Sequence, residues 1–304
     1  MIYLLQFIAG AILLYYGAEL LINSAKSISY IFGVSKIIVG ITIIAFGTSL
    51  PELFVSILAM FKNESDIVLG NVIGSNITNI GLVLGFSALT QSIIISYNRI
   101  KNDIIFMLLA TFTASVALYF NALNYWVAIL LIIGFMAYIY FMDVSDDSSY
   151  EVEDGRLLKS VILVLFSVCL LAYGSNLFII GATGLATFLG VSQLVIGMTV
   201  VALGTSVPEL ATSIVSIKKQ EYDFVIGNII GSNIFNIILV LAVSLFINKI
   251  DVSLLNMEIE ILFLIGLTVL VSFIIYQYNK LNRISGCIFL FAYFVFITLS
   301  YGRL

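Results

Sequence analysis

Two glutamates lie inside strongly apolar stretches and share the same neighbours. The segment Ala45-Phe46-Gly47-Thr48-Ser49-Leu50-Pro51-Glu52 returns as Ala202-Leu203-Gly204-Thr205-Ser206-Val207-Pro208-Glu209. Helical positions three and four apart share a face, so each copy aligns two hydroxyls with a carboxylate. A charged side chain at membrane depth costs about 2.5–3.5 kcal/mol on insertion scales. Glu52 and Glu209 are therefore candidates for a functional site.

A second polar block follows each glutamate. Gly70-Asn71-Val72-Ile73-Gly74-Ser75-Asn76-Ile77 returns as Gly227-Asn228-Ile229-Ile230-Gly231-Ser232-Asn233-Ile234. Ser75 with Asn79, and Ser232 with Asn236, are again four residues apart on one helical face. All these groups offer oxygen and the chain has no histidine, so the set suits Ca²⁺ or Na⁺ rather than zinc, copper or iron. For Asn71, Asn76, Asn228 and Asn233, hydrogen bonding between helices and support of an ion site remain equally open.

The only two prolines precede these glutamates. Pro51 has no N–H, so the carbonyl of Gly47 loses its helical partner, and we expect ring strain to loosen the bond to Phe46 or Ala45 as well. Pro208 predicts the same break in the second copy. A bilayer tolerates such backbone only where protein, a water-filled cavity or a bound cation satisfies it.

These motifs belong to a long duplication. Residues 13–84 align with 170–241 at a constant offset of 157, and about half of the positions are identical. With 62% hydrophobic and 10% charged residues, the chain is predicted to be an integral membrane protein. Ten apolar runs are predicted as membrane-spanning helices: 2–22, 37–60, 67–90, 103–120, 124–141, 158–180, 194–217, 224–247, 257–278 and 285–302. These runs lack the alternation of polar and apolar residues that is typical of barrel strands, and the first run is too long for a removable signal peptide.

Charge predicts the orientation of these spans. If the first loop is cytoplasmic, that side receives ten cations, namely Lys26, Lys36, Arg99, Lys101, Arg156, Lys159, Lys218, Lys219, Lys280 and Arg283. The other side receives three, Lys62, Lys249 and Arg303. This bias places both termini outside. Because each half holds five spans, the second half must enter the membrane upside down.

The predicted fold is therefore an all-α membrane protein of ten transmembrane helices in two inverted-topology five-helix repeats. The first repeat covers 1–142 with its motif region at 37–90, and the second covers 158–304 with its motif region at 194–247. An acidic cytoplasmic linker, 143–157, joins them and is expected to be flexible, a regulatory cation sensor being the alternative. Cys169 and Cys287 are expected to be isolated apolar side chains.

The paired Gly-Thr-Ser-x-Pro-Glu and Gly-Asn-x-Ile-Gly-Ser-Asn-Ile motifs closely resemble the two α-repeats of the calcium/cation antiporter superfamily. Within it, the chain is most similar to the prokaryotic sodium/calcium exchangers. The resemblance implies that Glu52, Glu209 and the carbonyls of Ala45 and Ala202 face Ca²⁺, with Thr48 and Thr205 nearby. It further implies that four serines complete the Na⁺ sites: Ser49, Ser75, Ser206 and Ser232. Asn79 and Asn236 would be central ligands of an ion or a water, where several exchangers carry an aspartate.

The resemblance implies an antiporter that exports Ca²⁺ in exchange for inward Na⁺, with three Na⁺ per Ca²⁺. The first and sixth spans would slide across the remaining core. An exchanger that uses H⁺ or also K⁺, and a passive cation channel, are the alternatives. Enzymatic activity is not expected, because no nucleophile–base pair, redox centre or phosphate loop is found among the motifs. We expect no cofactor and no nucleic-acid partner, only the two ions and the bilayer of the cell membrane, with the protein acting as a monomer.

Overall fold

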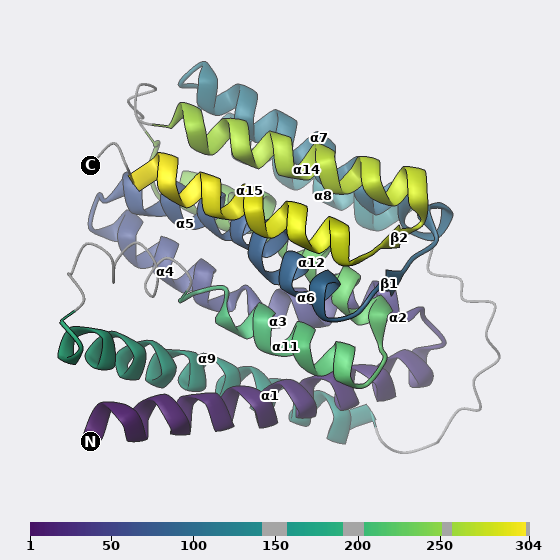
Figure 1. Cartoon of the computed structure of the whole chain (residues 1–304). Coiled ribbons are helices and arrows are strands. Elements are labelled where there is room, and N and C mark those ends of the chain that lie inside the picture. Colours follow the sequence, from purple (N-terminus) through teal and green to yellow (C-terminus); the bar gives the residue numbers. More distant parts are fainter. Residues whose placement is uncertain (142–156, 191–203, 251–256, 302–304) are drawn as a thin grey trace. The chain divides into compact units, whose positions relative to one another are not determined.

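The computed structural model consists of helices and one short two-stranded ribbon (Figure 1). It describes residues 1–141, 157–190, 204–250 and 257–301. The chain forms two compact units, which we call unit 1 (residues 1–50 and 144–228) and unit 2 (residues 51–143 and 229–304). Each unit combines segments from both halves of the sequence.

The order of elements follows the predicted spans. The first half contains α1 (Ile2–Phe32), α2 (Lys36–Val39), the π-helix η1 (Gly40–Ile44), α3 (Ala45–Thr48), α4 (Leu50–Phe61), α5 (Ser65–Thr78), the π-helix η2 (Asn79–Leu84), α6 (Gly85–Thr90), β1 (Ile93–Ile94), α7 (Tyr97–Tyr119) and α8 (Tyr125–Phe141). The second contains α9 (Leu157–Phe188), α11 (Val207–Lys218), α12 (Tyr222–Phe235), the π-helix η4 (Asn236–Val240), α13 (Leu241–Ile247), α14 (Glu258–Tyr278), β2 (Lys280–Leu281) and α15 (Arg283–Tyr301).

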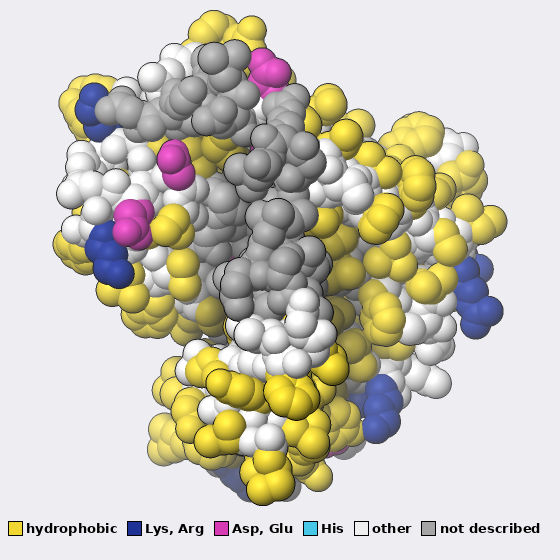
Figure 2. Space-filling model, turned by 60° about the vertical axis from the view of Figure 1, so that its left-hand side comes forward, with side chains coloured by type: hydrophobic (Ala, Val, Ile, Leu, Met, Phe, Trp, Pro, Cys, Tyr) yellow, Lys and Arg dark blue, Asp and Glu magenta, His cyan; other side chains and the backbone are white. Residues whose placement is uncertain are grey.

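Many of these helices are suited to a membrane. Within the described ranges, seven helices are long and apolar enough to cross one, and Lys36–Thr48 with Leu50–Phe61 forms an eighth candidate bent by 44°. Tyr125–Tyr140 is a shorter apolar helix, and most of the predicted span 194–217 lies outside the described residues. Hydrophobic side chains cover much of the visible surface, where charged ones are few (Figure 2). The membrane class is thereby supported, while the number of ten spans stays a prediction.

The duplication is visible in local geometry. α4 and α11 each have 12 residues, α5 and α12 each have 14, and both pairs are related by the sequence offset. Two pairs of left-handed residues also correspond: Gly33 (φ 62°) with Gly190 (φ 78°), and Asn63 (φ 59°) with Gln220 (φ 60°). The two π-helices η2 and η4 begin at equivalent asparagines. The two copies of the sequence therefore fold alike over these segments.

In unit 1, α1 and α9 pack along their lengths through glycines (Figure 1). A Cβ on Gly10 would lie 2.4 Å from the amide nitrogen of Phe178, and one on Gly181 would lie 2.3 Å from that of Phe7. Such distances leave no room for a side chain, so the glycines allow close approach of two backbones, as small residues do between membrane helices. α1 runs ten residues beyond its predicted end at 22, because Ser24, Ala25 and Ile28 are still buried.

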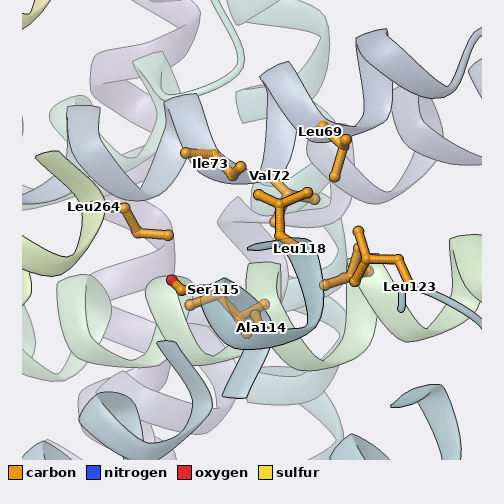
Figure 3. A pocket seen from close by; sticks show the side chains of 10 residues that line it. Leu69, Val72, Ile73, Ala114, Ser115, Leu118, Leu123 and Leu264 are labelled. Carbon is orange, nitrogen blue, oxygen red and sulfur yellow. The ribbon is translucent and has the colours of Figure 1, made fainter. Parts of the chain in front are cut away.

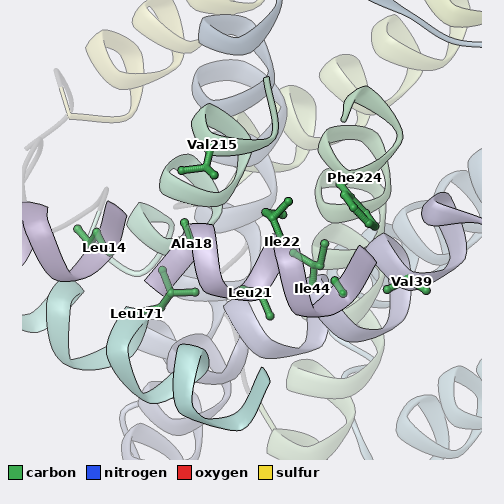
Figure 4. Packing of buried hydrophobic residues seen from close by; sticks show 10 residues of the cluster. Leu14, Ala18, Leu21, Ile22, Val39, Ile44, Leu171, Val215 and Phe224 are labelled. Carbon is green, nitrogen blue, oxygen red and sulfur yellow. The ribbon is translucent and has the colours of Figure 1, made fainter. Parts of the chain in front are cut away.

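An apolar cluster joins α1 to the rest of unit 1. Figure 4 shows Ala18 and Ile22 of α1 near Val215 of α11, with Phe224 of α12 in the same cluster. Leu171 brings α9 into this cluster. These side chains are almost completely buried. Hydrophobic packing thus fixes α1 beside α11.

Polar contacts reinforce this packing at one end of unit 1. Glu221, in the turn between α11 and α12, accepts hydrogen bonds from Lys26 Nζ at 2.5 Å and Lys36 Nζ at 2.6 Å. Lys219 pairs with Glu19 of α1 at 3.0 Å. Burial alone would raise the pKa of Glu221, but the two lysines outweigh it and hold that pKa below its ordinary value of 4.5.

Glu221→Gln is expected to lower the free energy of unfolding by about 1–3 kcal/mol at pH 7, because it removes charge-assisted hydrogen bonds. Since the folded-state pKa lies below the unfolded one, this stabilisation is present at neutral pH and is lost as pH falls below about 4.5. Melting in detergent at several pH values tests this. The matched control is Glu64→Gln, at the equivalent exposed position. If the stability difference between the wild-type protein and Glu221→Gln stays the same at low pH, the lysine contacts of Glu221 are not its source.

Unit 2 contains α4 from Pro51 on, α5 to α8, the part of α12 from Ile229 on, and η4 to α15. α15 packs on η2 and α6, where a Cβ on Gly286 would lie 2.6 Å from the amide nitrogen of Leu89. β1 pairs antiparallel with β2, joining two loops that the charge pattern assigns to the same side. At another loop cluster, Asn248 Nδ2 donates to Asn63 Oδ1 at 3.3 Å and the Ile250 amide donates to the Leu123 carbonyl. These three loops are likewise predicted to share one side.

Unit 2 contains a small, partly open apolar cavity of about 20 Å³. Ile73 of α5, Leu118 of α7 and Leu264 of α14 line it, with Ser115 as the polar side chain (Figure 3). The buried Ser115 hydroxyl makes no hydrogen bond within the described chain. A water needs two to four polar partners, so a lining with one hydroxyl favours a dry cavity.

Ser115→Ala is expected to leave the free energy of unfolding unchanged or raise it by about 1 kcal/mol, because an unsatisfied buried hydroxyl is removed. Ser244→Ala is the matched comparison, since the buried Ser244 hydroxyl donates to the Val240 carbonyl at 2.8 Å. Thermal melting of both variants in the same detergent measures the difference. A larger loss for Ser115→Ala than for Ser244→Ala would show that the hydroxyl has a partner.

Candidate functional site

The predicted site residues fall in both units. Unit 1 holds Ala45, Thr48, Ser49, Thr205, Ser206, Pro208 and Glu209, and unit 2 holds Pro51, Glu52, Ser75, Asn79, Ser232 and Asn236. Ala202 lies outside the described residues. Both glutamates are fully buried in apolar helices. The burial expected for a functional carboxylate is therefore present at both positions.

A helix begins one residue before each proline, at Leu50 and at Val207, and in the first copy the preceding helix is also described. α3 ends at Thr48, and Ser49 (φ −87°, ψ 4°) leaves helical geometry immediately before α4. Ser206 (φ −85°, ψ 4°) occupies the same conformation before α11. Each proline is thus at the start of a new helix, where a missing N–H costs nothing. Each glutamate follows in the first turn of that helix.

The carbonyl groups near the breaks differ from one another. The expected loosening at Ala45 is wrong: its carbonyl accepts from the Ser49 amide at 2.9 Å. The amide in this bond belongs to Ser49, two residues before Pro51, so the ring leaves the bond intact. Pro208 has the predicted effect on Gly204, whose carbonyl accepts from the Ser175 hydroxyl of α9 at 2.9 Å. Protein thereby satisfies one carbonyl that a proline releases.

In unit 1, Glu209 is linked to the first copy of the motif. Ser49 Oγ donates to Glu209 Oε1 at 3.3 Å. Asn228 of α12 contacts residues near each member of this pair. Its Oδ1 accepts from Thr48 Oγ1, next to Ser49, at 3.1 Å, and its Nδ2 donates to Thr212 Oγ1, one turn after Glu209, at 3.0 Å. Hydroxyls from the first repeat and a carboxylate from the second therefore form one buried polar cluster in unit 1.

In unit 2, Glu52 is accompanied by amides. Asn71 Nδ2 donates at 2.8 Å to both the Glu52 carbonyl and Ser56 Oγ. Asn79 Nδ2 donates to Asn233 Oδ1 at 3.2 Å, which connects α5 and η2 with α12. The sequence left the role of these asparagines open, and the contacts show that Asn71, Asn228 and Asn233 bond between helices.

Several buried neutral groups of the motifs make no hydrogen bond within the described parts of the chain. They are the Ser206 hydroxyl, both side-chain atoms of Asn236 and the Asn79 Oδ1 oxygen. An unsatisfied buried polar group costs about 1–3 kcal/mol and calls for an explanation. A cation or an ordered water bound to these atoms would supply one. Their oxygens are hard ligands of the type that Na⁺ and Ca²⁺ prefer.

Three π-helical turns found within the described residues were not predicted. η1 ends at Ile44, immediately before Ala45, whereas η2 begins at Asn79 and η4 begins at Asn236. The amide of Ala45 bonds back to the Gly40 carbonyl, five residues earlier. Single π-turns are rare and are frequent at functional sites, which agrees with their position beside predicted ligands. No residue pattern used in the sequence analysis distinguishes a π-turn from an α-turn.

The sequence analysis missed three hydroxyls: Ser56, Thr212 and Ser175. The first two follow their glutamates by four and three residues, a helical spacing that would have indicated them. Nothing local marks Ser175, which acts across helices. Among the described residues, no three His, Cys, Asp or Glu side chains gather as a metal site.

Comparison with known proteins agrees with these features. The profile of the family described as "Sodium/calcium exchanger protein" matches residues 2–143 and 159–302. An uncharacterized membrane protein of Methanocaldococcus jannaschii is 35% identical over 297 residues, covering 96% of this chain and 95% of the relative. The sodium/calcium exchanger MaX1 of Methanosarcina acetivorans is 27% identical over 337 residues, covering 96% of each chain.

Solved structures are also similar. The sodium-calcium exchanger NCX_Mj soaked with 2.5 mM Na⁺ and 0.1 mM Ca²⁺ matches with a TM-score of 0.84 and 33% identity, covering 98% of both chains. The same exchanger without Na⁺ and Ca²⁺ matches with a TM-score of 0.86. These comparisons and the duplicated motifs place the chain in the sodium/calcium exchanger family, within the calcium/cation antiporters.

Proposed function

We propose that this protein exchanges Na⁺ for Ca²⁺ across the cell membrane by alternating access and normally exports Ca²⁺. The observation that carries the proposal is the pair of fully buried glutamates in duplicated helix breaks, accompanied by unpartnered neutral oxygens. A buried carboxylate needs a compensating charge. A transported cation provides that charge, and its departure requires a replacement ion.

Ligand chemistry supports the choice of ions. Glu52 and Glu209 are the proposed charged ligands, and their combined charge equals that of one Ca²⁺. The carbonyls of Ala45 and Ala202, with Thr48 and Thr205, are proposed to bind Ca²⁺ with them. Ser49, Ser75, Ser206 and Ser232 are proposed for Na⁺, and Asn79 and Asn236 for an ion or a water. The buried, unpartnered amide of Asn236 supports its assignment, because both of its polar atoms lack a hydrogen bond within the described chain.

We propose the inverted topology with both termini outside. The 10-to-3 charge bias supports it. Contacts within each unit are consistent with it, because Lys26 and Lys36 share Glu221, and the loops around residues 93 and 280 pair through β1 and β2. A stoichiometry of three Na⁺ per Ca²⁺ is also proposed. It would move one net charge per cycle, worth about 2.3 kcal/mol per 100 mV.

Competition for binding tests the proposed function. Purified protein in detergent is expected to bind ⁴⁵Ca²⁺, and added Na⁺ is expected to displace it with a dependence steeper than first order. Choline at equal ionic strength is the control, since a non-specific salt effect would be common to both cations. Bound Ca²⁺ that falls equally with Na⁺ and choline would contradict a shared site, and absence of Ca²⁺ binding would reject the proposal.

A further inference from the structure

One face of α9 contacts the chain just before each of the two proline-containing helices, α4 and α11. Val168 and Ser175 are seven residues apart, or about two helical turns, so they lie on the same face of α9. The Ser175 hydroxyl donates to the Gly204 carbonyl at 2.9 Å. Val168 packs against Gly47, because a Cβ added to Gly47 would lie 2.7 Å from the Val168 Cγ2 atom. Gly47 and Gly204 are equivalent residues of the two repeats.

The hydrogen bond from Ser175 restrains the backbone of a proposed ligand. Pro208 has no N–H, so it cannot serve as the helical partner of the Gly204 carbonyl. A peptide group is planar, and a hydrogen bond to the Gly204 carbonyl therefore also restricts the Cα atom of Thr205. Thr205 is one of the proposed Ca²⁺ ligands. The buried Ser175 thus acts on the position of Thr205 through the peptide that joins it to Gly204.

The contact at Gly47 restrains the first repeat by shape. Gly47 is buried and directly precedes Thr48, which is also a proposed Ca²⁺ ligand. Apart from the chain neighbours and helix backbone of Gly47 itself, the Val168 Cγ2 atom is the one described atom within 4 Å of the added Cβ. Valine is branched at Cβ and is stiff, so this methyl group does not turn away freely. Gly47 can therefore approach α9 this closely because it has no side chain.

The two contacting side chains are particular to α9. α1 is the equivalent helix of the first repeat, and at the constant offset of 157 it carries Ala11 and Ala18 in place of Val168 and Ser175. Alanine has neither a hydroxyl nor the branched methyl groups of valine. Duplication alone therefore does not account for the presence of both side chains on one face of α9.

We propose that Val168 and Ser175 are positioning residues, and that this face of α9 holds the backbone that presents Thr48 and Thr205 to the transported cation. The inference rests on the proposed function. It gives α9 a part in Ca²⁺ affinity, although neither of these side chains is a proposed ligand. Altering either contact is therefore expected to change Ca²⁺ affinity in protein that still folds.

The first test moves a methyl group across the contact at Gly47. Gly47→Ala is expected to raise the Ca²⁺ concentration for half-saturation roughly 10-fold or more, as when groups that orient metal ligands are lost. Val168→Ala is expected to have a smaller effect. In Gly47→Ala/Val168→Ala the new methyl group takes the space of the removed one, and half-saturation is expected to return to within about threefold of wild type.

The measurement is Na⁺-driven Ca²⁺ uptake in proteoliposomes, from which half-saturation and maximal rate are obtained separately, with melting of the same preparations. Gly266→Ala is the control, because Gly266 is exposed in α14 and a Cβ there meets no atom within 4 Å. Alanine favours a helix more than glycine does, so helix propensity alone would not weaken Gly47→Ala.

The second test compares two buried serines of α9. Ser175→Ala is expected to raise half-saturation roughly 10-fold, because the Gly204 carbonyl loses its restraint. Ser160→Ala is the matched control, since the Ser160 hydroxyl bonds to Ser27 Oγ of α1 at 3.1 Å, away from the proposed ligands. Both variants lose a hydrogen bond to another segment and are expected to melt at similar temperatures, but half-saturation is expected to rise in Ser175→Ala alone.

Several outcomes would overturn the proposal. Normal half-saturation in folded Ser175→Ala would remove Ser175 from this role, and an equal rise in Ser160→Ala would reduce the effect to general stability. A double variant that binds Ca²⁺ no better than Gly47→Ala would remove Val168. If Gly47→Ala does not fold, the double variant decides, and raised half-saturation in it is equally contrary. Failure of the wild-type protein to bind Ca²⁺ would instead reject the proposed function.

Discussion

Sealed proteoliposomes loaded with Na⁺ are expected to take up external Ca²⁺, and this uptake is expected to cease when Na⁺ is equal on both sides. The physical reason is that the proposed ligands Glu52 and Glu209 would carry enough negative charge to compensate Ca²⁺ or Na⁺, but not full complements of both ions. Each tenfold Na⁺ gradient supplies about 1.4 kcal/mol for every Na⁺ moved. The measurement is ⁴⁵Ca²⁺ accumulation against time.

The ionic conditions distinguish the alternatives. Vesicles with a pH gradient but no Na⁺ serve as one control, and strong uptake there would indicate a proton exchanger. Uptake that needs no counter-ion would indicate a channel. A requirement for external K⁺ together with Ca²⁺ would add K⁺ to the transported ions.

Glu52→Gln and Glu209→Gln are each expected to reduce Na⁺-driven Ca²⁺ transport by roughly a hundredfold or more. Losing one partner of a buried charge interaction costs about 2–5 kcal/mol, and 1.4 kcal/mol corresponds to a factor of ten. The variants are expected to fold and insert normally, since the amide keeps the size of the side chain and removes a costly buried charge.

Transport is compared with the amount of folded protein from size-exclusion chromatography and melting. Glu64→Gln is the control, because Glu64 is exposed in the turn after α4. Near-normal Ca²⁺ flux in either buried-glutamate variant would remove that residue from the site. Loss of folded protein together with flux would assign the glutamate a structural role.

The positions of the helices were largely predictable, because long apolar runs leave few alternatives in a membrane protein. The end of α1 was not predictable from the sequence, because Asn23, Ser24 and Lys26 interrupt the apolar run at the predicted boundary. The helix nevertheless continues to Phe32, because buried contacts within unit 1 favour it over local composition.

The chemistry of the candidate site was predictable from residue types, but its hydrogen bonds were not. Repetition identified Glu52 and Glu209, and proline chemistry indicated the helix starts at Leu50 and Val207. The contact between Thr48 and Asn228 spans 180 residues, and no local pattern encodes such a pairing. For the same reason the sequence could not decide whether Asn71, Asn76, Asn228 and Asn233 form hydrogen bonds between helices or support an ion site.

The lengths of α1 and α9 have a consequence for the lipid environment. With 31 and 32 residues at 1.5 Å each, these helices are about 46–48 Å long, whereas the hydrocarbon layer is about 30 Å thick. Helices that are this much longer than the hydrocarbon layer must tilt from the membrane normal or extend into the headgroup layer. Since the glycine contacts bind the two helices to each other, they must adjust as a pair. Bilayer thickness is therefore expected to change the tilt of α1 and α9 together, independently of the Na⁺ and Ca²⁺ gradients.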